Sequence, residues 1–171
     1  MSTKVCNKCN IEKDLKDFYD CITSTDKKRG ACKICVSLQK KDMFETVKNR
    51  RTIRKYQQKD IAPDLLNDLL ETSFRASTMG GMQLYSVIVT RDAEMKEKLS
   101  PAHFNQPMVK GAPVVLTFCA DFRRFSKWCE QRNAVPGYDN LMSFMNASMD
   151  TLLVAQTFCT LAEEAGLGIC Y

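Results

Sequence analysis

Residues 141–166 read LMSFMNASMDTLLVAQTFCTLAEEAG, a stretch whose apolar side chains lie on nearly every side of a helix. This pattern predicts a helix from about Leu141 to Ala165, and Gly166 suits its C-terminal cap. A helix that is apolar all round must be buried on several sides, and a small domain offers too little of its own chain to cover it. We therefore predict a homodimer with this helix near its centre.

Upstream of that stretch the sequence predicts four further helices. Asp42 and Glu45 have the spacing of a capping box, which opens a helix that runs to about residue 49. Pro63 suits the first turn of a second helix. Residues 92–99 and 122–132 predict the other two. The apolar face of the second helix comprises Leu65, Leu66, Leu69, Leu70 and Phe74.

Two segments between these helices have the composition of strands. Residues 84–90 and 113–119 are rich in β-branched and aromatic side chains, so we expect two buried strands there.

Length and charge limit the organisation of the chain. Its 171 residues, of which 44% are hydrophobic, suffice for one moderate core and one small accessory module. The net charge is +5, and most of the excess lies in residues 1–40, which hold nine lysines and arginines against five acidic residues. Any general attraction to nucleic acid should therefore reside in this segment. The N-terminus lacks an apolar signal-peptide run, so we expect a cytoplasmic protein.

Cysteine spacing predicts a metal site in residues 1–40. Cys6 and Cys9 form one CxxC unit, and Cys32 and Cys35 form a second, which allows four thiolates to bind one tetrahedral zinc. Iron is the alternative metal, because four thiolates suit it equally. The pattern is similar to zinc-ribbon or treble-clef modules. Such modules often contact nucleic acid, and equally often the zinc only folds the peptide, so both roles stay open here.

A basic cluster follows the first predicted helix of residues 41–171. Arg50, Arg51 and Arg54 surround Thr52, which places three guanidinium groups and a hydroxyl within a short length of chain. Arginine forks match phosphate oxygens, so this cluster is suited to a phosphorylated ligand, although a solvated basic surface is the plainer interpretation.

Several short segments together resemble the nitroreductase family of flavoproteins, and the resemblance covers residues 42–171. The branch it resembles most is that of the FMN-dependent flavin reductases and NADPH nitroreductases. The segments that carry it, in chain order, are RRTIRKY at 50–56, RASTMGGMQ at 75–83, Asn105-Gln106 ahead of Ala112-Pro113, Cys119-Ala120-Asp121, and Gly166-Leu167-Gly168.

The resemblance implies an α+β fold in which helices flank a mixed sheet. It also implies an entwined homodimer with FMN at the subunit interface. The residues it assigns to the cofactor are Arg50, Arg51, Thr52 and Arg54 at the phosphate and ribityl chain, Ser77, Thr78 and Gln83 from the partner subunit, Asn105 and Gln106 at the ring or ribityl arm, and Gly168 through Tyr171 beside the ring.

The implied activity is that of the flavin, with no catalytic side chain. NAD(P)H passes hydride to FMN and leaves, and a nitroaromatic, quinone or flavin acceptor then takes the reducing equivalents, so the kinetics should be ping-pong. His103 is interpreted as a surface or packed histidine, with contact to nicotinamide or acceptor as the alternative.

The chain departs from the family pattern at its end. It stops at Tyr171, where family members continue, so we expect residues 41–171 to be an incomplete FMN-binding domain. The alternative function is therefore an inactive flavoprotein remnant whose zinc module, residues 1–40, binds nucleic acid or protein.

Overall fold

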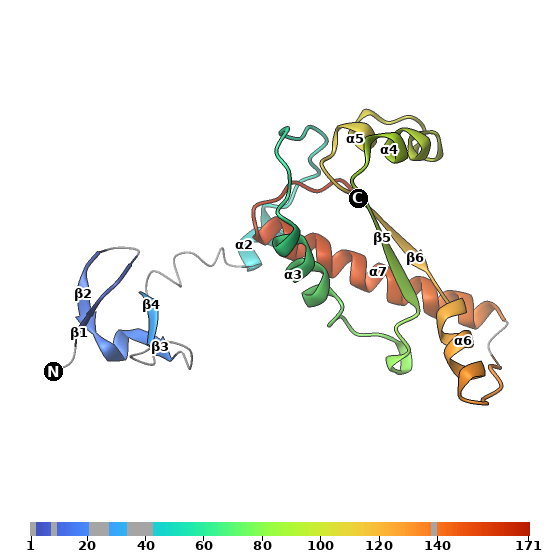
Figure 1. Cartoon of the computed structure of the whole chain (residues 1–171), viewed down its shortest axis with the longest axis horizontal. Coiled ribbons are helices and arrows are strands. Elements are labelled where there is room, and N and C mark those ends of the chain that lie inside the picture. Colours follow the sequence, from blue (N-terminus) through green and yellow to red (C-terminus); the bar gives the residue numbers. More distant parts are fainter. Residues whose placement is uncertain (1–2, 8–9, 21–27, 34–42, 138–139) are drawn as a thin grey trace. The chain divides into compact units, whose positions relative to one another are not determined.

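The computed structural model describes residues 3–7, 10–20, 28–33, 43–137 and 140–171. The chain divides into two compact units, Met1–Asn49 and Arg50–Tyr171. Figure 1 labels their helices and strands.

The N-terminal unit contains two short antiparallel strand pairs among its described residues. β1 pairs with β2, and β3 pairs with β4. Its buried hydrophobic cluster consists of Cys6, Phe18 and Cys32. So small a cluster gives little hydrophobic stabilisation for a unit of this length. The elements are β1 (Thr3–Val5), β2 (Glu12–Asp14), η1 (Leu15–Asp17), β3 (Phe18–Asp20), β4 (Lys28–Cys32) and α2 (Met43–Lys48).

The C-terminal unit is built around one long helix and one strand pair. The helix α7 (Leu141–Glu164) packs against both strands and against α3 (Pro63–Ser73), as Figure 1 shows. The strands β5 (Tyr85–Thr90) and β6 (Val115–Ala120) run antiparallel along their whole length. The other elements are η2 (Met79–Gly81), α4 (Ala93–Leu99), η3 (Ser100–His103), α5 (Pro107–Gly111) and α6 (Arg123–Gln131).

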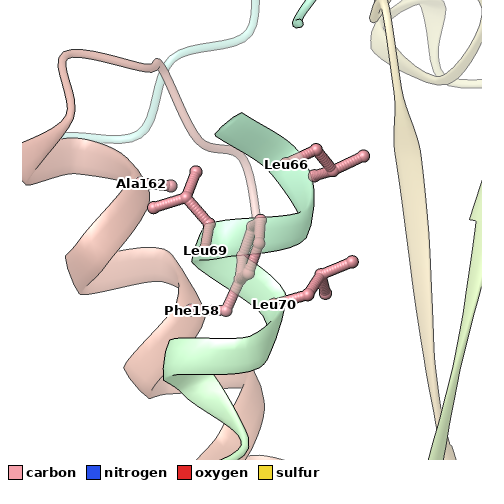
Figure 2. Packing of buried hydrophobic residues seen from close by; sticks show 5 residues of the cluster. All are labelled: Leu66, Leu69, Leu70, Phe158 and Ala162. Atoms are coloured by element: carbon pink, nitrogen blue, oxygen red, sulfur yellow. The ribbon is translucent and has the colours of Figure 1, made fainter. Parts of the chain in front are cut away.

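The main core lies where α3 meets α7 (Figure 2). Leu66, Leu69 and Leu70 of α3 pack with Phe158 and Ala162 of α7, and all five are less than 10% exposed. Burying one leucine side chain contributes about 1.5–3 kcal/mol. This contact therefore fixes the position of α7. Leu66, Leu69 and Leu70 confirm the predicted apolar face of α3, and Phe74 packs partly buried against it. Leu65, at 36% exposed, does not belong to this face.

The ends of α4 and α7 confirm the expected boundaries, whereas Asp42, the predicted cap of the first helix, lies outside the described residues. The side chain of Asp92 accepts a hydrogen bond from Met95 N at 2.8 Å and caps α4. Asn140 does the same for Ser143 N at 2.9 Å at the start of α7. Gly166 follows α7 with a φ of 87°, a conformation that glycine adopts without a steric penalty.

Two expectations about the strands differ from the structure. Ile88 and Val89 of β5 are 56% and 41% exposed, and β6 is half-buried with an exposed end, so neither is the buried strand that its composition predicted. The sheet that we expected to be mixed is an antiparallel pair within the described part of the C-terminal unit. Apolar composition alone does not tell a strand covered by its own chain from one left open.

One face of α7 is apolar and open in the isolated chain. Its large exposed side chains recur every three or four residues along the first half of the helix, which places them on one stripe. The stripe consists of Leu141, Met142, Phe144, Met145, Met149, Leu152 and Leu153, between 41% and 76% exposed. In the residues that the structure describes, α7 is nevertheless not long and apolar enough to cross a membrane, and neither is any other helix.

Candidate functional site

The basic cluster lies beside the C-terminal segment of the chain. Ile53 N donates a hydrogen bond to Ile169 O at 2.9 Å, so residues 50–54 run next to residues 168–171. A Cβ on Gly168 would lie 2.9 Å from Ile53 Cγ2, too close for any side chain. Two of the segments that the sequence assigned to one ligand are therefore adjacent in the structure.

The three arginines of the cluster differ in their partners. Arg50 Nε lies 3.3 Å from Glu163 Oε2 at the end of α7, and the glutamate side chain is only 11% exposed. Arg51 and Arg54 are exposed and form no ion pair with a described residue. Thr52 is exposed between them. The segment thus presents two guanidinium groups and a hydroxyl, while Arg50 is oriented by Glu163.

Tyr56 lies close to Cys170 on the same side of the unit. Burial raises the pKa of the Tyr56 phenol, and the neighbouring Cys170 raises it further. The phenol therefore lies near both the C-terminal segment and Arg54.

The loop from Ser77 to Gln83 forms a second candidate cluster. Gly80, Gly81 and Gln83 adopt left-handed φ values of 57°, 67° and 53°. The side chains of Ser77 and Gln83 are exposed, and Thr78 is half-buried. The loop therefore presents polar side chains from a backbone conformation that most residues avoid.

Asp150 of α7 binds this loop through hydrogen bonds to two backbone amides. Its Oδ1 accepts from Met79 N at 2.8 Å and its Oδ2 accepts from Leu84 N at 3.2 Å. Asp150 has no role among the residues predicted from the sequence. The available signal was a carboxylate in the middle of an apolar helix, which must find donors if it is buried.

A second set of contacts holds Gln83. Arg124 Nη2 donates to Gln83 O at 2.6 Å, and Arg124 N donates to Asp121 Oδ1 at 3.2 Å. Ser86 donates to the other carboxylate oxygen of Asp121. The hydrogen bond from Ser86 is the main reason that the pKa of Asp121 lies below its usual value.

The two clusters lie at different places along α7. Asp150 binds the loop and Glu163 binds Arg50. At 1.5 Å per residue, these two carboxylates are about 20 Å apart along α7. Within one chain, therefore, the structure does not bring Ser77, Thr78 and Gln83 to Arg51 and Arg54.

Asn105 and Gln106 lie in the exposed connection between η3 and α5. Phe104 and Asn105 both have positive φ, at 55° and 53°, and Phe104 is 86% exposed. His103 is exposed, which agrees with its interpretation as a surface histidine. No hydrogen bond found among the described residues links Asn105 or Gln106 to the arginine cluster.

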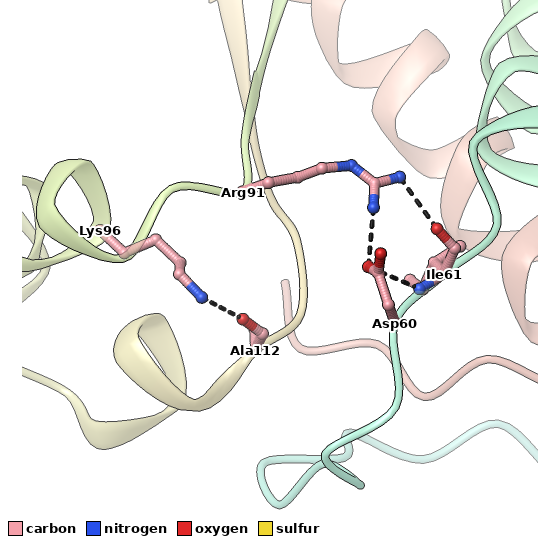
Figure 3. Close-up of polar contacts among 5 residues, drawn as sticks. All are labelled: Asp60, Ile61, Arg91, Lys96 and Ala112. Atoms are coloured by element: carbon pink, nitrogen blue, oxygen red, sulfur yellow. Dashed lines mark hydrogen bonds and ion pairs between the residues drawn. The ribbon is translucent and has the colours of Figure 1, made fainter.

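Polar contacts fasten the chain between the arginine cluster and α3 (Figure 3). Arg91 donates to Asp60 Oδ1 at 2.7 Å and to Ile61 O at 3.0 Å, from the end of β5. Lys96 of α4 donates to Ala112 O at 2.8 Å. The contacts of Arg91 position the segment that follows residues 50–56, and the contact of Lys96 joins α4 to the end of α5.

In the N-terminal unit two of the four predicted metal ligands lie together. Cys6 and Cys32 are fully buried, and Cys32 N donates to Cys6 Sγ at 3.2 Å. Cys9 and Cys35 lie outside the described residues. Among the residues that are described, no group of three or more metal-ligating side chains occurs.

Comparisons with known proteins cover most of the chain. The model of the nitroreductase family matches residues 47–171. The FMN reductase (NADPH) of Bacillus subtilis is 34% identical over 130 residues, which are 75% of this chain and 52% of that protein. A crystal structure from Bacteroides fragilis is 90% identical with a TM-score of 0.73, over 74% of this chain and 51% of that one. The NfrA1 nitroreductase of B. subtilis is 33% identical with a TM-score of 0.73, over 75% and 53%.

The α+β fold of the C-terminal unit is therefore that of a known class of proteins, the nitroreductases. The chain belongs to the nitroreductase family. It spans about half the length of the curated relatives it matches.

Proposed function

We propose that this chain supplies the FMN site of an NAD(P)H-dependent oxidoreductase that reduces nitroaromatic, quinone or flavin acceptors by a ping-pong mechanism. The observation that carries the proposal is the pairing of residues 50–54 with residues 168–171. In this pairing Arg51 and Arg54 have no acidic partner among the described residues. A doubly ionised phosphate fits this donor set, because arginine binds phosphate oxygens through two parallel hydrogen bonds.

In this proposal each segment has a separate task. Arg51, Thr52 and Arg54 bind the phosphate and ribityl chain, and Glu163 orients Arg50 beside them. The backbone from Gly168 to Tyr171 lies along the ring. When bound, the FMN accepts hydride from a nicotinamide and passes reducing equivalents to the acceptor.

The other assigned residues contact the same cofactor from elsewhere. Asn105 and Gln106 approach the ring or ribityl arm from the η3–α5 connection. Ser77, Thr78 and Gln83 come from the partner subunit, because the length of α7 keeps them away from the arginines of their own chain.

We further propose that two copies of the chain pair through the apolar stripe of α7. Large exposed apolar patches are uncommon on monomers and mark interfaces. The stripe from Leu141 to Leu153 spans about 18 Å of helix, and its side chains lie on one face. A self-complementary stripe of this kind suits a two-fold dimer.

A comparison of FMN with riboflavin tests the phosphate assignment. Arg51→Ala and Arg54→Ala should each weaken FMN binding about 10- to 100-fold, because a charge-assisted hydrogen bond contributes about 1.5–3 kcal/mol. The Kd for riboflavin, which has the ribityl chain but no phosphate, should rise much less than the Kd for FMN. Lys55→Ala is the matched control, since Lys55 is an exposed cation of the same segment. Equal loss for both ligands, or no FMN binding by the wild-type protein, would refute the proposal.

For the N-terminal unit we propose that Cys6, Cys9, Cys32 and Cys35 bind one zinc ion. The support is the burial of Cys6 and Cys32 side by side, together with the small hydrophobic cluster of the unit. Metal analysis should find one zinc per chain in the wild type and none in Cys6→Ser. The control Cys119→Ser, in the other unit, should keep its zinc. A red protein containing iron, or a metal content unaffected by Cys6→Ser, would contradict the assignment.

A further inference from the structure

The hydrogen bonds of Asp150 join α7 to both ends of one short loop segment. The side chain is only 1% exposed, and its two oxygens accept from Met79 N and Leu84 N. A buried carboxylate costs several kcal/mol of desolvation unless donors compensate for it. Here both donors are backbone amides of the loop, so the charge is balanced only while the loop keeps its present conformation.

The segment held in this way has an uncommon backbone. Gly80, Gly81 and Gln83 have left-handed φ values, and Gln83 is not a glycine. The carbonyl oxygen of Gln83 accepts from Arg124 Nη2 at 2.6 Å and from Tyr85 N at 2.8 Å. Glycine-rich segments have many conformations open to them, so anchoring at both ends selects one of them.

The side chains that the loop presents are polar and accessible. Ser77 precedes the anchored segment and Gln83 lies inside it, and both are exposed. A loop that is ordered before its ligand arrives loses less conformational entropy on binding, and this raises the affinity.

We infer that Asp150 is a positioning residue that presets the Met79–Leu84 segment for contact with a flavin held by another copy of the chain. This inference rests on the proposed function. It adds that the loop depends on a carboxylate of α7 that touches no cofactor itself.

The position of Asp150 on α7 links the loop to the proposed dimer. Met149, Leu152 and Leu153, its neighbours along the helix, belong to the exposed apolar stripe, whereas Asp150 faces the loop. Because α7 is a rigid element, pairing of the two stripes fixes the position of each loop along α7 of the other copy.

The substitution Asp150→Asn tests the inference with little change of shape. An asparagine side chain has one accepting oxygen and one donating NH2 group. The NH2 group would face one of the two backbone N–H donors and cannot accept from it, so one of the two hydrogen bonds is lost. We expect hydrogen exchange at the Met79 or Leu84 amide to accelerate by about 10- to 100-fold, as for the loss of one buried hydrogen bond to a charged group.

Flavin binding gives a second readout. The Kd of Asp150→Asn for FMN and for riboflavin should rise together, by about 10-fold, because the ring contact is weakened and the phosphate contact is not. A general loss of structure would instead lower the thermal midpoint and accelerate exchange in α3 as well. Glu164→Gln, a carboxylate change at the end of α7, is the matched control and should leave both readouts unchanged.

The outcomes separate this inference from the proposed function. If the wild-type protein binds no flavin, the proposed function fails, and exchange at Met79 and Leu84 still tests the anchor. If the wild type binds FMN, unchanged exchange and unchanged Kd in Asp150→Asn overturn the inference. Should Asp150→Asn fail to fold, Arg124→Ala removes the side-chain hydrogen bond to Gln83 O and leaves the one from Tyr85 N. An unchanged Kd for both flavins in that variant then overturns the claim that the preset loop contributes to flavin affinity.

Discussion

Gly168→Ala is the most specific test of the contact between the arginine segment and the C-terminal segment. A Cβ at position 168 would lie 2.9 Å from Ile53 Cγ2 and 3.0 Å from Ile53 Cβ. Both atoms are close to the backbone, so Ile53 cannot escape by rotating a flexible end. The two segments must move apart, and the hydrogen bond from Ile53 N to Ile169 O lies directly beside the clash.

The size of the movement follows from these distances. Carbon atoms pack at about 3.5–4.0 Å, so the contact must open by about 0.6–1.1 Å. The same movement lengthens the 2.9 Å hydrogen bond to about 3.5 Å or more, which is beyond its effective range. Loss of the bond costs about 0.5–1.5 kcal/mol, and residual crowding costs about 1–3 kcal/mol where the segments do not separate fully.

Two measurements check this prediction. The thermal midpoint should fall by about 2–6 °C, given the usual relation between free energy and midpoint for chains of this size. The Kd for FMN should rise by about 3- to 30-fold, because the arginines no longer lie against residues 168–171. Gly111→Ala is the control, since nothing lies within 4 Å of its Cβ, and it should leave both values unchanged. Unchanged FMN binding and stability in Gly168→Ala would refute the proposed pairing of the two segments.

Three other predictions concern the dimer and the buried groups. Met145→Glu with Leu152→Glu should convert a dimer to a monomer in analytical ultracentrifugation, because two charges then lie in the apolar stripe; a dimer of unchanged stability would contradict the interface. Burial raises the pKa of the Cys159 thiol, so this cysteine should react with a thiol reagent at neutral pH only after unfolding, and rapid labelling of the native protein would be inconsistent with its position. Ser86→Ala should raise the carboxyl pKa of Asp121 toward its usual value in a carbon NMR titration. Because the pKa is depressed in the folded protein, the carboxylate stabilises the fold above the unfolded pKa of about 3.9, and this stabilisation is lost as the pH falls through the folded pKa. An unchanged titration would exclude Ser86 as the cause of the depressed pKa.

The elements that local patterns specify were predictable from the sequence. The helices α3 and α7 carry their apolar periodicity and their own end signals, such as Pro63 and Gly166, so their bounds could be placed within about two residues. The short elements η3 and α5 were missed, because Pro101 and Pro107 interrupt any periodic pattern in so few residues.

The contacts that build the site were not predictable in the same way. Asp150 meets Met79 and Leu84 across 71 and 66 residues of sequence, and no local pattern encodes such a pairing. The exposure of β5 and of the α7 stripe likewise depends on what covers them, which composition does not specify. The resemblance to a family predicted which segments contact one ligand, while the structure showed which of these segments a single chain brings together.

A mixed dimer tests the central claim, that each flavin site takes its arginines from one copy of the chain and its loop from the other. One tagged subunit carries Arg54→Ala and the second carries Gln83→Ala, and the purified heterodimer is titrated with FMN. If the clusters come from different copies, one site holds both changes and the other holds none, so the titration should find one site of wild-type affinity per dimer. No site of wild-type affinity would show that both clusters act within the same chain and would contradict the account.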